Sequence, residues 1–222
     1  MGAAVLKKQF ESVLGGHLDW QSRPSPELVP SGISEIGLPR GGLTEIFGPA
    51  SSGRTSLLVS ILAEATAREE VCALVDAEDC FDPVSAAAAG VRLPRLLWVR
   101  CGHNAEHALK AADLLIQGGG FGLVAMDLGD TPPQTARRIS LTSWFRLRRA
   151  VEHTPTVLVT VARQSNAKTC ASLQLECARE RTVWSGGARL LRAIAVRVGQ
   201  ASRPVLFHRS KLCSPVFTAT AI

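Results

Sequence analysis

Short apolar runs alternate with helical patterns through most of the chain. Each run has the length of a strand, and together they are LTEIFG, CALVDA, LLWVRC, LVAMDL and TVLVTVA. Strands that crossover helices cover on both faces are apolar throughout, as these runs are, and such strands build largely parallel sheets. The pattern therefore predicts an α/β fold with a mostly parallel sheet.

After Ala162 the pattern changes, because strand-like segments now follow one another with no helical pattern between them. These segments are CASLQLEC, AIAVRVGQ, PVLFHRSK and VFTATAI. Consecutive strands without crossover helices are typical of antiparallel pairing. We therefore expect antiparallel C-terminal strands that extend the same sheet.

The N-terminal segment has a pattern of its own. Its apolar residues recur at helical spacing and stop at a Gly-Gly pair; they are Val5, Leu6, Phe10, Val13 and Leu14. The following stretch, HLDWQSRPSPELVPSG, holds three prolines and no sustained period, which is typical of a linker. We expect a short amphipathic helix and linker over 1–30 and a core domain over 31–222.

Composition adds little that is specific. A length of 222 residues fits one α/β domain with a small appendage, and the net charge of +6 weakly favours an acidic partner such as nucleic acid. No apolar run approaches the roughly 18 residues of a membrane helix, and the N-terminus lacks the apolar core of a secretory signal. We expect a cytoplasmic protein without a membrane partner.

The six cysteines contain no C-x-x-C pair, and we expect buried thiols rather than disulfides or a metal site. Cys101, His103 and His107 are the one combination that suggests a metal, with the histidines four residues apart if they share a helix. A fourth ligand is not evident near them, so a metal is not the favoured interpretation.

The segment GPASSGRT, residues 48–55, lies between an expected strand and an expected helix and matches a phosphate-binding loop except at Arg54, where the pattern has lysine. Backbone N–H groups and the helix N-terminus would hold phosphate, and Thr55 would bind Mg²⁺. The expected ligands are ATP or ADP with Mg²⁺, and binding should survive the arginine better than hydrolysis. The predicted loop residues are Gly48, Pro49, Ala50, Ser51, Ser52, Gly53, Arg54, Thr55 and Ser56.

Two acidic elements follow the loop. Asp127 ends the run LVAMDL, where a carboxylate reaches the magnesium of such a loop through water, although a strand-end aspartate also caps turns. In LVDAEDCFDP four acids crowd a strand end, where one could act as general base. The alternative for this cluster is a helix N-terminus that favours acids through its dipole.

Three segments together resemble the RecA recombinase core in order and spacing over most of residues 30–222. They are VPSGISEIGLPRGGLTEIFGPASSGRTSLL, VDAEDCFDP and VLFHRSKLCSPVFTATAI. The resemblance implies that Glu78 is the catalytic glutamate, Asp82 a contact to adenine and Asp127 the aspartate of the second motif. It also implies that Arg209 and Lys211 reach the phosphates of a neighbouring subunit; the alternative is solvated charges on an edge strand.

The chain also departs from that family. Ser85 stands where the family has an aromatic residue that stacks on adenine, and Arg163 stands at the position of its switch glutamine. Only LGDTPP follows Asp127 and only RQSNAK follows Ala162, where the family has long loops that hold DNA. Nucleotide affinity and DNA handling should therefore both be reduced.

A RecA-like core with short DNA loops resembles the ImuA-type accessory proteins of damage-induced (SOS) mutagenesis. This resemblance implies a role in DNA repair or translesion synthesis through protein partners, such as a recombinase or the accessory proteins of an error-prone polymerase. The alternatives are a DNA-dependent ATPase, or a module that caps or disrupts recombinase filaments. The N-terminal helix could equally serve a homo-oligomer.

The helix expected within TARRISLTSWFRLRRAVEH combines an apolar stripe with arginines. The stripe, expected in the core, is Leu141, Trp144, Leu147 and Val151. The arginines are Arg137, Arg138, Arg146, Arg148 and Arg149, and they either neutralise DNA phosphates nonspecifically or form a solvated face.

Overall fold

The fold is known from a computed structural model, which describes residues 26–33, 36–184, 191–200 and 216–218. The expected N-terminal helix lies outside the described residues. So do Arg209 and Lys211, and the strand expected at PVLFHRSK. The architecture below concerns the described residues alone.

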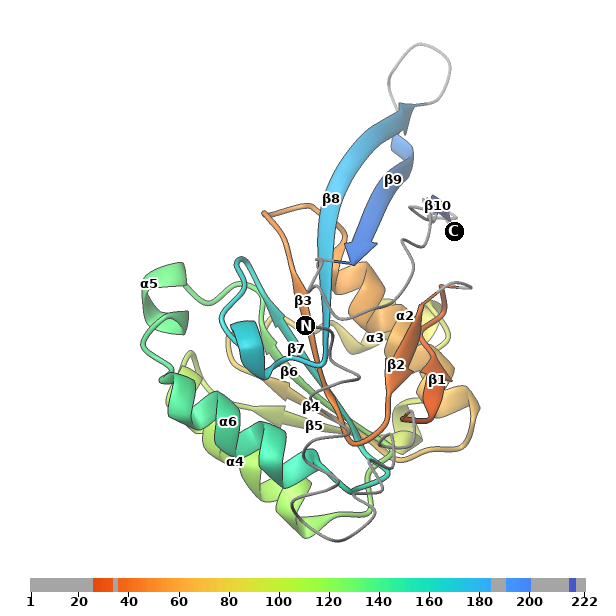
Figure 1. The fold of residues 1–222 in the computed structure, drawn as a ribbon. Coiled ribbons are helices and arrows are strands. Elements are labelled where there is room, and N and C mark those ends of the chain that lie inside the picture. Colours follow the sequence, from red (N-terminus) through yellow and green to blue (C-terminus); the bar gives the residue numbers. More distant parts are fainter. Residues whose placement is uncertain (1–25, 34–35, 185–190, 201–215, 219–222) are drawn as a thin grey trace, which may run out of the picture.

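Among these residues one sheet of eight strands forms the centre, in the order β10-β9-β8-β3-β7-β6-β4-β5 (Figure 1). The strands from β8 to β5 are parallel to their neighbours, as the apolar runs predicted. Their bounds are β3 (Leu43–Phe47), β4 (Cys72–Asp76), β5 (Leu96–Arg100), β6 (Leu123–Leu128), β7 (Val157–Ala162), β8 (Leu173–Trp184), β9 (Leu191–Gln200) and β10 (Val216–Thr218).

The C-terminal strands extend this sheet, with one correction. Strand β8 pairs with β3 in parallel, and antiparallel pairing begins only between β8 and β9 and continues to β10. Parallel pairing is possible because β8 enters the sheet from the same end as β7, after a connection that includes the short helix η2 (Lys168–Cys170). Beyond the end of β3, β8 and β9 continue as a two-stranded ribbon (Figure 1).

The expected linker is also partly structured. Strand β1 (Leu28–Pro30) pairs with β2 (Gly37–Pro39) in antiparallel register, and the Val29 side chain is buried. Prolines are tolerated here because Pro30 and Pro39 end the strands of a two-stranded sheet in which each strand is an edge. The three prolines were therefore a misleading signal for this stretch.

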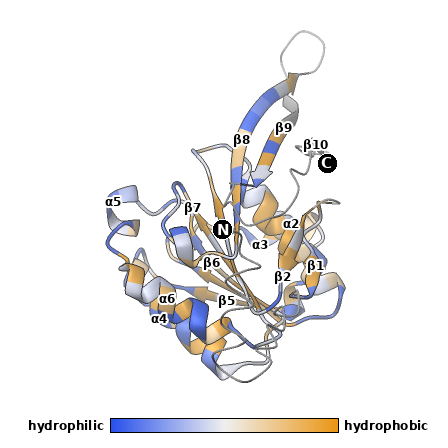
Figure 2. Ribbon diagram, in the orientation of Figure 1, coloured by the Kyte–Doolittle hydropathy of each residue, from blue (hydrophilic) through white to orange (hydrophobic). Residues whose placement is uncertain are grey.

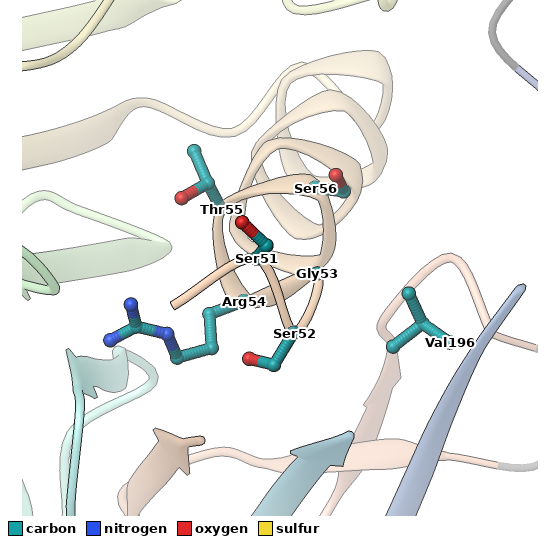
Figure 3. Close-up of a pocket in the computed structure, with 7 residues that line it drawn as sticks. All are labelled: Ser51, Ser52, Gly53, Arg54, Thr55, Ser56 and Val196. Carbon is teal, nitrogen blue, oxygen red and sulfur yellow. The ribbon is translucent and has the colours of Figure 1, made fainter. Parts of the chain in front are cut away.

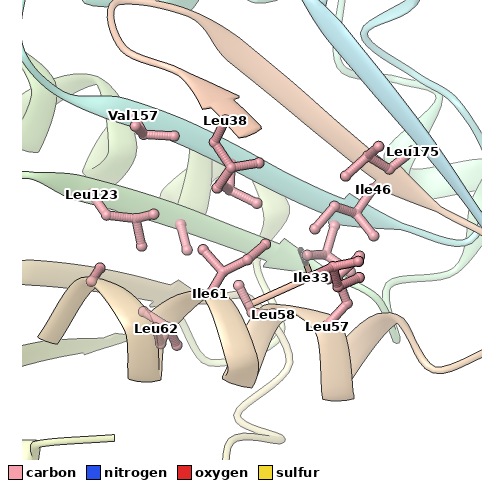
Figure 4. Packing of buried hydrophobic residues seen from close by; sticks show 14 of the residues in the cluster. Ile33, Leu38, Ile46, Leu57, Leu58, Ile61, Leu62, Leu123, Val157 and Leu175 are labelled. Carbon is pink, nitrogen blue, oxygen red and sulfur yellow. The ribbon is translucent and has the colours of Figure 1, made fainter. Parts of the chain in front are cut away.

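Helices cover both faces of the sheet, which explains why its central strands β4, β6 and β7 are mostly apolar. Helix α2 (Arg54–Ala67) packs on one face, where Leu57, Leu58, Ile61 and Leu62 meet residues of β3, β6, β7 and β8 (Figure 4). Helices α4 (Ala105–Gly118) and α6 (Leu141–Val151) cover the other face. The shorter helices are α3 (Pro83–Ala88), η1 (Leu93–Arg95) and α5 (Pro133–Ala136).

Helix α6 confirms most of the predicted apolar stripe. Trp144, Leu147 and Val151 are buried against the sheet, and Ser140 caps the helix by accepting the N–H of Ser143. Leu141, however, is 46% exposed, because it occupies the first turn, beyond the edge of the core. The mixture of colours along α6 in Figure 2 reflects this division between an apolar inner face and a basic outer one.

None of the helices in the described part of the chain combines the length and the apolar character needed to cross a membrane.

Candidate nucleotide site

The connection from β3 to α2 has the backbone of a phosphate loop. Ser51 and Gly53 adopt positive φ angles of 57° and 89°, which turn the chain into the helix. The first intrahelical bond of α2 runs from Leu57 N to Gly53 O, at 2.9 Å, so the preceding N–H groups face the loop. No acidic residue lies in the first turn of α2. This N-terminus is therefore suited to an anion.

The loop encloses a hollow of about 240 Å³, lined by residues 51–56 and by Val196 of β9 (Figure 3). Within it, the Ser52 hydroxyl is buried and has no hydrogen-bond partner among the described residues. A buried hydroxyl without a partner is costly, and a phosphate oxygen would supply the missing bond. The hollow is smaller than typical pockets for whole ligands, which start at about 300 Å³, and suits phosphate groups.

Two glycines allow the C-terminal strands to pack against the loop. A Cβ atom at Gly48 would lie 2.2 Å from the Cys177 carbonyl oxygen, and one at Gly53 would lie 2.5 Å from Val196 Cγ2. Both contacts are shorter than any side chain tolerates, so glycine is required at both positions. The loop is thus held in shape by β8 and β9 as well as by its own turn.

Arg54, the residue that departs from the pattern, begins α2 and is only 6% exposed. Its Nη1 donates to the Gly129 carbonyl at 3.1 Å, and Figure 3 shows the side chain on the opposite side of the loop from Val196. Burial lowers the pKa of Arg54, against the attraction of Asp127 and Asp130. The guanidinium therefore lies beside the acidic end of β6.

Asp127 lies at that end of β6, in register with Asp76 on the neighbouring β4. Its Oδ1 accepts the Gly129 N–H at 2.7 Å. Burial raises the pKa of Asp127 to about 6, and nearby Asp76 and Asp130 add to the rise, while the Gly129 hydrogen bond opposes it. A divalent cation would relieve this crowding of negative charge, so the residue fits the predicted role in holding Mg²⁺, with Thr55 exposed in the first turn of α2.

Replacing Asp127 by asparagine should stabilise the metal-free protein. The folded-state pKa lies above that of the unfolded chain, so the ionised carboxylate disfavours folding at neutral pH, and this penalty is lost progressively as the pH falls from about 6 to about 4. Asp127→Asn should therefore gain about 2–3 kcal/mol at pH 7.5 and much less at pH 4.5. Urea denaturation of parent and variant in EDTA at both pH values measures this gain. A less stable variant at pH 7.5 would show that the ionised Asp127 does not disfavour folding.

Glu78 follows β4 and has both carboxylate oxygens engaged. Oε1 accepts the Thr131 hydroxyl at 2.7 Å, and Oε2 lies 3.0 Å from Nδ1 of His103. Thr131 is buried, whereas His103 is exposed. Glu78 thus joins the connection after β6 to the connection after β5.

The other acids of the cluster have local partners. Asp76 is buried and accepts the N–H groups of Cys80 and Phe81 and the indole N–H of Trp98. Asp82 caps α3, accepting the N–H groups of Val84 and Ser85, and these bonds lower its pKa together with the Ser85 hydroxyl, the largest cause. Asp82 thus matches the alternative of a helix N-terminus, whereas Asp76 holds the turn that follows β4. The adenine contact of Asp82 stays a prediction.

The contacts of two further residues in this region could not be predicted from the sequence. Glu45 in β3 is fully buried and accepts hydrogen bonds from Asn166 N, Ala167 N, the Ser165 hydroxyl and the Gln174 side chain. Arg163 donates to the Gly129 carbonyl through Nε at 3.2 Å. The partners lie far apart in the chain, and periodicity cannot reveal such contacts.

The residues considered for a metal do not converge. His103 precedes α4, which begins at Ala105 after its cap Asn104, so the two histidines do not share a helix. Nowhere in the described ranges do three or more His, Cys, Asp or Glu side chains gather as metal ligands. The cysteines described are free thiols, and Cys80 is exposed, contrary to the expectation that all are buried.

A largely parallel sheet with a glycine-rich loop between its β3 and α2 defines a P-loop type of α/β fold. Comparison with known proteins narrows this class: residues 27–132 match the family model of the RecA N-terminal domain. The matched residues thus form a RecA-like domain, as the sequence resemblance implied.

Individual relatives agree with the family match. The chain is 33% identical to protein RecA of Chloroflexus aurantiacus over 159 residues, which are 62% of this chain and 45% of that protein. It is 40% identical to protein RecA of Borrelia duttonii over 127 residues, 57% of this chain and 34% of that protein. It is 44% identical to protein RecA of Ectopseudomonas oleovorans over 93 residues, which are 41% of this chain and 26% of that protein. The chain thus spans less than half the length of these curated relatives.

Proposed function

We propose that this chain is a RecA-like accessory protein of DNA repair or damage-induced mutagenesis, of the ImuA type, that acts by binding protein partners and hydrolyses ATP weakly or not at all. The RecA-like domain supports a role connected with DNA recombination and repair. The accessory role, and the link to translesion synthesis, rest on how this chain departs from that family.

The observation that carries the proposal is the engagement of Glu78. A general base needs a lone pair within hydrogen-bond reach of the attacking water. One oxygen of Glu78 already accepts the Thr131 hydroxyl and the other contacts His103, so both partners would compete with that water for the carboxylate. Positioned acid–base groups contribute about 10²–10⁴-fold to a rate, so this arrangement supports slow turnover.

Nucleotide binding is part of the proposal. The N–H groups at the start of α2 would hold phosphate, Ser52 would add a hydrogen bond, and Thr55 and Asp127 would hold Mg²⁺, which supplies charge neutralisation when bound. Ser85, in α3, offers no aromatic face for adenine. Affinity for ATP or ADP should therefore be low. Arg209 and Lys211 remain candidates for contacts across a subunit interface.

Direct contact with DNA would be electrostatic and nonspecific. The connections after β6 and β7 are short, and they touch each other where Arg163 donates to the Gly129 carbonyl. The neighbouring exposed arginines and lysine could neutralise phosphates, but stubs of this length offer no mobile loop to surround a strand. These cationic residues are Arg137, Arg138, Arg149 and Lys168. The DNA-dependent ATPase remains the alternative that a DNA-stimulated turnover would favour.

The proposed partner-binding element is the N-terminal helix, because its apolar stripe needs a protein surface. Phe10→Asp with Leu14→Asp should weaken capture of recombinase or polymerase accessory proteins at least tenfold, since each buried side chain contributes about 1.5–3 kcal/mol. Purified partners in a pull-down measure this, with circular dichroism to check folding.

Lys8→Ala with Ser12→Asp is the matched control, because it makes the same charge change on the polar face of the predicted helix. The control should bind as the parent does. Equal binding by all three proteins would exclude a docking role for the helix, and unfolding of the first variant would place the helix in the core.

A further inference from the structure

Arg54 makes a buried contact that differs from the phosphate contact its place in the loop implies. Its Nη1 shares the Gly129 carbonyl with Nε of Arg163, at 3.1 and 3.2 Å. The N–H of the same glycine donates to Asp127. Gly129 is buried, and its N–H and C=O groups are thus both fixed, by residues from α2, β6 and the end of β7.

The charges around Arg54 favour this position. Burial and the neighbouring Arg163 lower the pKa of Arg54, while Asp127 and Asp130 attract the guanidinium; Asp130 also pairs with Arg163 at 3.5 Å, which offsets part of the repulsion between the two arginines. If Arg54 turned toward a phosphate, the half-buried carboxylate of Asp127 would lose a nearby cation. A lysine could not replace the contact well, because its ammonium is a compact charge on a flexible stem and lacks the planar set of donors.

Apart from Arg54, the hollow of the loop is lined by neutral groups. Its lining side chains other than Arg54 are serines, Thr55 and Val196, and the Ser52 hydroxyl is the buried donor without a partner. Figure 3 shows the guanidinium of Arg54 extending to the side opposite Val196. Phosphate would thus meet N–H and O–H groups, with no side-chain cation of the loop in the place where lysine reads the outer phosphates.

We propose that Arg54 is a positioning residue that ties the phosphate loop to the connection after β6, and that the loop consequently binds the diphosphate shared by ADP and ATP without reading the third phosphate. This inference rests on the nucleotide binding proposed above. It predicts two independent results, one in nucleotide selectivity and one in stability.

Calorimetry with ADP and ATP, each with Mg²⁺, tests the selectivity. The two dissociation constants should agree within about threefold, because the backbone cradle binds what both ligands share. ATP binding at least tenfold tighter than ADP, with that preference lost in Arg54→Gln, would overturn the proposal. If neither nucleotide binds, the proposed nucleotide site and its diphosphate selectivity fail together, and the stability result alone decides the positioning role.

Thermal unfolding without nucleotide tests the positioning role. Arg54→Gln should lower Tm by about 5 °C, because a charged hydrogen bond is lost and the Asp127 carboxylate loses a cation. Arg54→Lys should show a smaller fall, since it keeps the charge but not the fork. Exposed Arg149→Gln is the control and should leave Tm unchanged. An Arg54→Gln protein as stable as the control would overturn the positioning role; failure of that variant to fold, with a reduced Tm for Arg54→Lys, would support it.

Discussion

Replacing Glu45 by alanine should destabilise the protein by about 3–5 kcal/mol, because the substitution leaves several buried donors without an acceptor. The carboxylate accepts two backbone N–H groups, from Asn166 at 2.5 Å and Ala167 at 2.8 Å, and also the Ser165 hydroxyl and the Gln174 amide. These partners belong to the connection after β7 and to β8. Glu45 therefore fastens that connection to the strand that leads into the phosphate loop.

Urea denaturation measures the loss, and hydrogen exchange of residues 163–168 locates it. Glu176→Ala is the matched control, since this exposed glutamate lies on neighbouring β8 and should change stability by less than about 0.5 kcal/mol. If Glu45→Ala were as stable as the control, or if exchange in 163–168 stayed unchanged, the connection would be ordered by something other than this carboxylate.

Trp144→Ala should have an effect of similar size, about 3–5 kcal/mol, because it removes the largest fully buried side chain of the described core. The indole packs between the sheet and α4, in the cluster that contains Leu43, Met126 and Leu147. Its Nε1 has no hydrogen-bond partner there. Trp144→Phe should therefore lose much less, since it keeps an aromatic ring and removes the unpaired donor.

The neighbouring Phe145→Ala is the control for Trp144, because Phe145 is 42% exposed and its removal leaves no cavity. Thermal or urea unfolding of the three variants should show that Trp144→Ala is far less stable than Trp144→Phe and Phe145→Ala. Equal losses for Trp144→Ala and Phe145→Ala would show that α6 does not anchor this face of the sheet.

The parallel part of the sheet could be predicted because burial on both faces leaves a direct mark on the sequence. Strands β4, β6 and β7 are apolar at every position but one, β3 is buried but holds Thr44 and Glu45, and the phosphate loop between β3 and α2 has its own pattern. The parallel pairing of β8 with β3 left no such mark, since register between distant strands depends on tertiary packing. Likewise, the prolines around β1 predicted a linker, although an edge strand tolerates a proline at its end.

The candidate site was predictable in its members but not in their contacts. The sequence motifs identified Arg54 and Asp127 as site residues. From the sequence we expected Arg54 to contact phosphate less well than lysine does. In the structure its side chain instead donates a hydrogen bond to the Gly129 carbonyl. Similarly, the sequence offered His103 as a candidate metal ligand, but in the structure it contacts Glu78. Such pairings join residues from different connections, so only the folded arrangement of strand ends reveals them.

The proposal that this chain hydrolyses ATP weakly or not at all is tested most directly by ATP turnover of the parent and of Glu78→Ala, with Mg²⁺ and single-stranded DNA. Protein RecA of one of the relatives serves as the positive control. We expect turnover at least about 100-fold below that control, and no difference between parent and variant, because Glu78 is held by Thr131 and His103. DNA-stimulated turnover near that of the control, abolished by Glu78→Ala, would contradict the proposal and identify the chain as an ATPase.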